Sequence, residues 1–229
     1  MKGVWWKSLS AILIVYALVA GLLLPVPRLP ILNETIRNLY FHVGMWFAML
    51  ALWAGSAWFA FRQLKTNSPE IDRRSAAAAE VGFAFGILGL LTGMLWAQFT
   101  WGKFWVNDPK LNGTAISLLM YLAYFVLRSS VDDPHRKARL SAVYNLFAFV
   151  LMIVFIQVLP RFTDSLHPGN GGNPAFSQYD LDAGMRRVFY PAMIGWILLG
   201  YWILDLLYRV RSLEAETSPE SALDFPSHS

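Results

Sequence analysis

Long apolar stretches alternate with short polar ones along the chain, and this alternation predicts membrane-spanning helices. A span needs about 20 mostly apolar residues to cross a hydrocarbon core of roughly 30 Å. By that measure the sequence contains six spans, with expected bounds near Leu9 to Val26, Tyr40 to Phe61, Ala77 to Ala97, Gly113 to Leu127, Leu140 to Leu159 and Val188 to Tyr208. Because a helix satisfies its own backbone polar groups, we expect an all-α integral membrane protein, a bundle of six transmembrane helices.

The composition agrees with a chain whose main solvent is lipid. Hydrophobic residues make up 56% and charged residues 15%, well below the usual quarter for charged residues, and the mean hydropathy is +0.42. The absence of cysteine excludes disulfides, thiolate metal sites and thioether chemistry from this chain. We divide the chain into a membrane domain, residues 1–211, and a polar tail, residues 212–229, that is expected to be disordered and cytoplasmic.

The first apolar run and the basic residues predict the orientation. Lys2 and Lys7 precede the first run as in a signal peptide, but Pro25 and Pro30 follow it and no small-residue cleavage site is present. We therefore expect a retained first span, with cleavage as the alternative. Twelve of the 19 lysines and arginines fall on the side of the two termini, and seven fall on the other side. The positive-inside rule then predicts a multi-pass protein with both termini in the cytoplasm.

The segment of residues 96–114 joins the third and fourth spans on the outer side and is dense in aromatic residues. Five aromatics fall between Trp96 and Trp105, followed by the carboxylate of Asp108. One interpretation is an interfacial aromatic belt, where indole rings lie at headgroup level. The other is an apolar platform for a flat, hydrophobic ligand with polar groups at its edge. The residue types alone do not choose between the two.

The order of residues in this segment resembles a known signature. Trp101, Gly102, Trp105 and Asp108 stand at the spacing of the tryptophan-rich motif W-G-x-x-W-x-W-D (the WWD domain) of the CcmC/CcsA family of haem-handling membrane proteins. Asn107 stands where that motif has its third tryptophan. The resemblance covers nearly the whole membrane region and fits the six-span layout of the CcmC type, although the Asp-Pro-Lys form that follows is closer to the CcsA type.

The resemblance implies a ligand set for haem iron. In that family a histidine on each side of the tryptophan-rich loop supplies an axial ligand, and His42 and His167 occupy matching positions. It therefore implies a haem b held by His42 and His167, beside a seat formed by Trp96, Trp101, Gly102, Trp105 and Asp108. Neutral imidazole suits haem iron, and a histidine within a span is costly unless it faces protein or a polar cavity. Taken alone, His42 also fits a hydrogen bond at a helix start, and His167 a solvated loop residue.

Asp108 has two interpretations of its own. An aspartate before an apolar helical run can accept backbone N–H bonds and cap the fourth span. It can also orient the loop or a partner near a haem edge. We do not expect it to bind iron, because a hard carboxylate is a poor match where two imidazoles are available.

Other polar residues of the outer side have weaker signals. Lys103, Lys110, Arg161 and Arg37 are candidates to pair with haem propionates, because basic groups bind carboxylates by charge-assisted hydrogen bonds. Residues 169–173, rich in glycine and asparagine, are typical of a flexible turn that lets the loop bearing His167 move, or of a passive linker.

The resemblance implies haem delivery in cytochrome c biogenesis rather than enzymatic catalysis. The expected partners are the periplasmic haem chaperone CcmE, the ATP-driven subunits CcmA and CcmB, the small CcmD, and membrane lipid, but no nucleic acid. No phosphate-binding G-x-x-x-x-G-K-[ST] motif is present, so any use of ATP belongs to a partner. Two alternatives remain: a CcsA-type cytochrome c synthase that attaches haem directly, and a small-molecule transporter with an aromatic vestibule.

Overall fold

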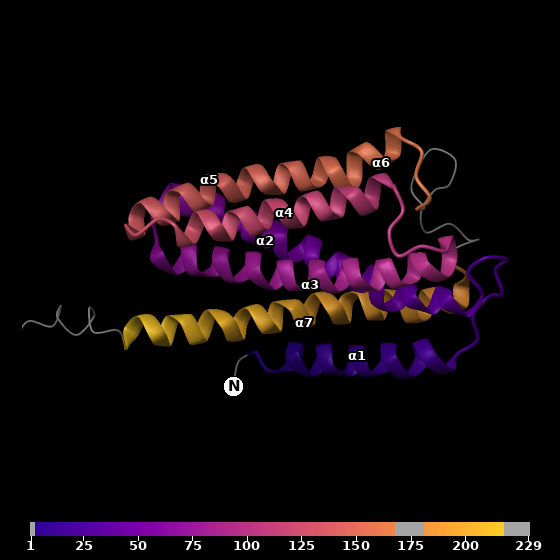
Figure 1. The fold of residues 1–229 in the computed structure, drawn as a ribbon. Helices are drawn as coiled ribbons and strands as arrows, with labels where there is room; N and C mark the ends of the chain where they lie inside the picture. Colours follow the sequence, from indigo (N-terminus) through magenta and orange to yellow (C-terminus); the bar gives the residue numbers. More distant parts are fainter. Residues whose placement is uncertain (1–2, 168–180, 218–229) are drawn as a thin grey trace, which may run out of the picture.

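The computed structural model describes residues 3–167 and 181–217, and this part of the chain is helical (Figure 1). The α-helices are α1 (Trp5–Leu23), α2 (Gly44–Thr66), α3 (Pro69–Trp101), α4 (Pro109–Ser129), α5 (Pro134–Ile153), α6 (Leu159–Phe162) and α7 (Ala183–Glu216). A 3-10 helix, η1 (Asn33–Asn38), and a π-helix, η2 (Leu39–Val43), lead into α2, and a second π-helix, η3 (Val154–Val158), links α5 to α6. Residues 169–173, for which the sequence predicted a flexible turn or a passive linker, lie outside the described residues.

The prediction of a six-span helical bundle is confirmed. Within the described ranges, six helical segments are long and apolar enough to cross a membrane: Trp5–Leu23, Asn33–Thr66, Pro69–Trp101, Pro109–Ser129, Pro134–Phe162 and Ala183–Glu216. In Figure 1, α4 and α5 lie on one side of the bundle and α1 on the other, with α2, α3 and α7 between them. Helix α2 packs against α3, α5 and α7, whereas α1 packs mainly against α7.

The two ends of the bundle differ in what they carry. The start of α1 and the end of α7 lie together, because Lys7 Nζ contacts Asp205 Oδ2 at 2.7 Å. We call this the terminal end, and it also holds the α2–α3 and α4–α5 turns. The opposite site end carries residues 24–38, 102–108 and 163–167 (Figure 1). An even number of spans returns the chain to the side on which it began, as the sequence predicted.

The tryptophan-rich segment is more helical than its glycines and proline suggested. Helix α3 continues through Trp101 and ends at Gly102, whose φ of +76° is the left-handed conformation that favours glycine. Helix α4 begins directly after Asp108, whose carboxylate accepts hydrogen bonds from two backbone N–H groups of the first turn. Of the predicted loop, residues 96–114, only 102–108 lie outside an α-helix.

The last helix is longer than the apolar run that predicted it. Helix α7 continues to Glu216, so the prediction of a disordered tail from residue 212 is wrong for its first residues. Arg211 is bound to Glu80 of α3, with 2.6 Å between a guanidinium nitrogen and Oε2. This ion pair fixes the last turns of α7 against α3, and hydropathy alone does not detect it. Residues 218–229 lie outside the described part.

Close helix packing forms the core between α2, α3 and α4. An added Cβ at Gly82 of α3 would lie 2.4 Å from Trp53 Cδ1, so only glycine admits this ring. The Trp53 ring is fully buried and stacks on Tyr121, with centroids 3.8 Å apart and an interplanar angle of 5°. Small residues that let helices approach closely are typical of packing in membranes.

A buried polar network ties four helices together beside this core. Asn145 of α5 donates from Nδ2 to Ser56 Oγ at 2.7 Å and to Ser75 Oγ at 3.1 Å. Its Oδ1 accepts from the Tyr121 hydroxyl at 3.3 Å. All four side chains are buried, so these bonds satisfy groups that lipid could not.

Candidate functional site

A cavity of about 400 Å³ opens at the site end, and both predicted histidines line it. Its walls come from η2, α2, α3, α4, η3, α6 and the segment after α6. Most of the wall is apolar, and a few polar side chains converge on it, which is the usual character of a cofactor-sized pocket. The two π-helices, η2 and η3, both border the cavity through His42 and Ile156. Such π segments are rare and frequent at functional sites.

His42 is held by the backbone of α3. Its Nδ1 lies 3.0 Å from the carbonyl oxygen of Gly89 and 3.2 Å from the hydroxyl of Thr92. A carbonyl oxygen can only accept, so Nδ1 carries the hydrogen and Nε2 keeps its lone pair. No described residue forms a hydrogen bond with Nε2. The interpretation of His42 as a hydrogen-bonded histidine near a helix start is thus correct, and it leaves the other ring nitrogen available as a ligand.

Gly93 on α3 makes room for this histidine, and it is one of three glycines that line the cavity from this helix. An added Cβ at Gly93 would lie 2.7 Å from Cε1 of His42, and one at Gly86 would meet Met49 and Leu118. Gly86, Gly89 and Gly93 all line the cavity. The sequence analysis did not identify them, although their spacing of three and four residues puts them on one helix face.

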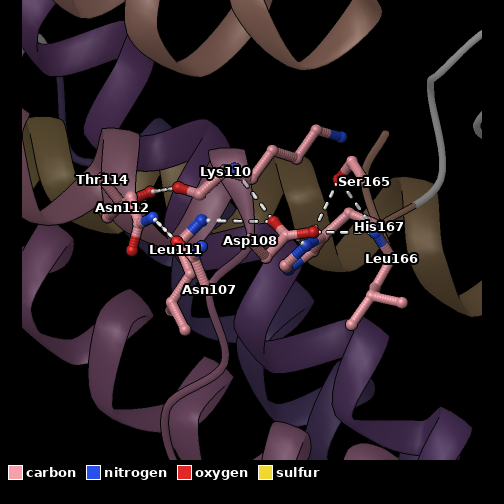
Figure 2. Close-up of polar contacts among 9 residues, drawn as sticks. All are labelled: Asn107, Asp108, Lys110, Leu111, Asn112, Thr114, Ser165, Leu166 and His167. Atoms are coloured by element: carbon pink, nitrogen blue, oxygen red, sulfur yellow. Dashed lines mark hydrogen bonds and ion pairs between the residues drawn. The ribbon is translucent and has the colours of Figure 1, made fainter. Parts of the chain in front are cut away.

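His167 is positioned by Asp108 across 59 residues of sequence. Figure 2 shows the contact between the two side chains. The distance from Nδ1 of His167 to Oδ1 of Asp108 is 2.8 Å. The other oxygen, Oδ2, accepts from the backbone N–H of Leu166 at 2.7 Å and from the hydroxyl of Ser165 at 2.9 Å. Asp108 therefore caps α4 and also orients the segment that carries His167. The interpretation of Asp108 as the cap of α4 is confirmed, and the interpretation that it orients the loop or a partner near a haem edge stays a prediction.

The environment of Asp108 keeps its carboxyl ionised. Burial by itself would raise the pKa of this carboxyl, which is only 1% exposed. Hydrogen bonds from His167, Leu166 and Ser165 outweigh that effect and hold the pKa well below its usual range. Oδ1 of this carboxylate accepts the hydrogen of His167 Nδ1, so the contact with Asp108 involves Nδ1 and not Nε2. A carboxylate behind a histidine orients the ring and raises its basicity as a ligand.

The three tryptophans of the motif segment have different places. Trp96 lines the cavity, contacts His42 edge-on at 5.9 Å between ring centroids and donates from Nε1 to Thr35 Oγ1 at 3.1 Å. Trp101 contacts His167 edge-on at 4.9 Å. Trp105 is 42% exposed and, like Trp101 and Gly102, is not part of the described cavity wall. Only Trp96 and Trp101 therefore lie against the histidines.

Asn107 stands where the motif has a tryptophan, and its side chain is turned toward α4. Its Oδ1 accepts a hydrogen bond from Nδ2 of Asn112 at 2.7 Å (Figure 2). This contact ties the segment before Asp108 to the first turn of α4. Where the motif has an indole ring, this chain therefore has an amide that forms a hydrogen bond with the start of α4.

Of the four basic residues that the sequence offered as partners for haem propionates, two line the cavity and two do not. Lys110 and Arg161 line the cavity. Arg37 is bound to Glu34 at 2.7 Å and to the carbonyl oxygens of Gly21 and Leu24. Lys103 is exposed and is not part of the cavity wall.

The chain matches a known protein family over nearly its whole length. The family model described as heme exporter protein C matches residues 2–221. The chain is similar to heme exporter protein C of Paracoccus denitrificans, with 29% identity over 187 residues, which is 79% of this chain and 73% of that protein. It is also similar to heme exporter protein C of Bradyrhizobium diazoefficiens, with 37% identity over 115 residues, 50% of this chain and 43% of that one.

A shorter stretch of the chain is similar to a protein of the CcsA type. The chain is 39% identical over 93 residues to the cytochrome c biogenesis protein CcsA of Prochlorococcus marinus, which is 41% of this chain and 29% of that protein. The similarity to heme exporter protein C thus covers more of both chains.

Proposed function

Because the chain belongs to the heme exporter protein C family of haem-handling proteins, we propose that it holds haem between His42 and His167 and delivers it in cytochrome c maturation. The observation that carries this proposal is that both rings lie at one cavity and bind a protein acceptor through Nδ1. Nδ1 of His42 is bound to the carbonyl oxygen of Gly89, and Nδ1 of His167 is bound to Oδ1 of Asp108. Nε2 is therefore the nitrogen of each ring that we assign to the iron. A metal-binding histidine usually has its other ring nitrogen bound to a carbonyl or carboxylate in this way.

The walls of the cavity suit the apolar macrocycle of haem and its charged propionates. Aliphatic and aromatic side chains from η2, α2 and α3 provide its apolar walls. Lys110 and Arg161 on the wall supply positive charge for the propionates. Trp105 lies exposed outside the wall. We assign it to the surface from which a partner takes the haem.

In this proposal the site end faces the periplasm, where the haem chaperone CcmE receives the haem, and the termini lie in the cytoplasm. The excess of basic residues at the terminal end supports this orientation. ATP-driven release then belongs to the partner subunits CcmA and CcmB, acting with CcmD in the inner membrane.

The test is haem binding by histidine variants of the purified protein. His42→Ala and His167→Ala should each lose most of the haem and the low-spin absorption spectrum of an iron with two imidazole ligands. The matched control is His135→Ala, because His135 is exposed at the terminal end. Retention of full haem with an unchanged spectrum in both single variants would contradict the axial assignment.

Trp105→Ala separates delivery from binding. Since this ring is exposed and outside the cavity wall, we expect slower transfer to CcmE with haem retention and membrane insertion close to wild type. A loss of insertion would instead support the interfacial belt.

A second function, direct attachment of haem as a CcsA-type synthase, is favoured by the similarity to CcsA of Prochlorococcus marinus. Co-expression with an apocytochrome in cells lacking CcmE distinguishes the two functions. A haem-delivery protein yields no mature cytochrome there, whereas a synthase does.

A further inference from the structure

A second cavity, of about 360 Å³, lies at the terminal end, away from the histidines. It is formed over α3, between the ends of α4 and α7 and the start of α5, which frame α3 at this end of Figure 1. Four basic side chains line it, together with one carboxylate, one hydroxyl and two apolar side chains: Arg73, Arg128, Lys137 and Arg211, with Glu80, Ser129, Ala76 and Phe125.

The positive charge of this cavity is only partly compensated. Arg128 forms a two-pronged ion pair with Asp72, and Arg211 is bound to Glu80. No described carboxylate lies within ion-pair distance of Arg73 or Lys137. The Nε atom of Arg73 is buried and has no hydrogen-bond partner among the described residues. An unsatisfied buried guanidinium donor is costly, and an anionic oxygen would satisfy it.

The surface beyond the cavity is apolar. On α3, Ala76 and Glu80 of the cavity are followed at helical spacing by Ala84, Ile87 and Leu91. All three of these are exposed, Ile87 by 39% and Leu91 by 55%. A basic pocket at one end of a span, continued by an apolar helix face, matches a molecule with an anionic head and hydrocarbon chains.

We propose that this cavity binds the phosphate headgroup of an anionic phospholipid, with the acyl chains lying along the exposed face of α3. Arg73 and Lys137 contact the phosphate, while Arg128 and Arg211 shape the pocket through their ion pairs with α3. Basic pockets between spans are the usual sites for anionic headgroups, and each nearby lysine or arginine strengthens binding. This site is separate from the haem site and does not depend on its function.

The test compares two double variants that remove the same charge. R73Q/K137Q removes the two uncompensated cations, whereas R74Q/R136Q removes their exposed sequence neighbours, which are not part of the cavity wall. Native mass spectrometry of the full-length protein in neutral detergent gives the apparent Kd for phosphatidylglycerol and for phosphatidylcholine. Competition with inorganic phosphate forms a third arm.

We expect R73Q/K137Q to bind phosphatidylglycerol more weakly by roughly tenfold, and R74Q/R136Q to stay close to wild type. Phosphatidylcholine should bind weakly to all three proteins. Equal loss in both double variants, or no loss in R73Q/K137Q, would overturn the proposal. Displacement of the lipid by equimolar phosphate would reassign the cavity to a free phosphate ion.

The single variant K137Q covers the case in which the double variant does not fold. Lys137 lies in the first turn of α5 and is not part of an ion pair among the described residues. An intermediate loss of phosphatidylglycerol binding supports the site, and wild-type binding contradicts it.

Discussion

Asp108 and His167 lie 59 residues apart in sequence and are joined by a hydrogen bond of 2.8 Å between Oδ1 and Nδ1. The same Oδ1 accepts from the backbone N–H of Lys110 at 2.9 Å at the start of α4. The position of His167 is therefore coupled to the position of a membrane helix. A single buried carboxylate makes both contacts, so we expect substitutions at Asp108 to affect the start of α4 and the position of His167 together.

Asp108→Asn should weaken haem binding by about 10- to 100-fold, the usual cost of losing the group behind a metal-binding histidine. An amide can still cap α4, but it cannot provide the charged acceptor for Nδ1 of His167. Haem titration followed by the visible spectrum measures the effect.

The control for this variant is Asp133→Asn. Asp133 caps α5 by accepting from the backbone N–H of Arg136 at 2.7 Å, on the exposed surface of the terminal end. It should leave haem affinity unchanged. Equal affinities of the two variants would show that the charge of Asp108 does not act on His167.

Gly93→Ala should displace His42. The added Cβ would lie 2.7 Å from Cε1 of the ring, closer than carbon atoms approach without movement. Alanine is otherwise favoured over glycine in a helix by roughly 0.5–1 kcal/mol, so the fold should persist. We expect a change from a low-spin to a high-spin haem spectrum as one axial ligand is lost.

Gly55→Ala is the matched control for the glycine variant. Its added Cβ meets the Tyr201 hydroxyl oxygen at 3.1 Å and lies outside the cavity wall. A low-spin spectrum that is retained in both variants would contradict the role of Gly93 in seating His42.

Arg161→Gln should reduce haem affinity by about tenfold, because a charge-assisted bond to a propionate is lost. Lys103→Gln should have no effect, since Lys103 is outside the cavity wall. The sharper measurement repeats the titration with haem dimethyl ester, which has no free propionates. If Arg161 pairs with a propionate, wild type and Arg161→Gln should bind the ester equally. A persistent difference would indicate that Arg161 acts on the fold of the site.

Asn145→Ala should destabilise the bundle by about 1–2 kcal/mol, because it removes three hydrogen bonds between helices, each worth on average roughly 0.6 kcal/mol in a membrane protein. The change leaves the Ser56 and Ser75 hydroxyls without their shared partner. Thermal unfolding in detergent measures the loss, and the haem spectrum of the folded protein should be unchanged. Ser129→Ala is the control, because the exposed Ser129 hydroxyl bonds only its own helix. Equal melting temperatures for the two variants would mean that the network contributes little.

The six spans and the family could be recognised from the sequence alone, which also predicted His42 and His167 as the ligands of haem iron. Span length is a local property, since hydrocarbon thickness fixes how many apolar residues must follow one another. The spacing of Trp101, Gly102, Trp105 and Asp108 is equally local, and it carried the family resemblance from which His42 and His167 followed. Hydropathy did not predict where α3 ends and where α4 begins. A glycine in the left-handed conformation ends α3, and an aspartate cap begins α4.

Only the tertiary structure decided which groups hold the two rings and which cations reach the cavity. Gly93 admits His42, and Asp108 orients His167, through contacts between segments that are far apart along the chain. Lys103 and Arg161 look alike as sequence candidates, yet only Arg161 lines the cavity. The reason is physical: a hydrogen bond or a close approach depends on distances below about 4 Å between packed helices, and hydropathy constrains the length of each helix but not its rotation against its neighbours.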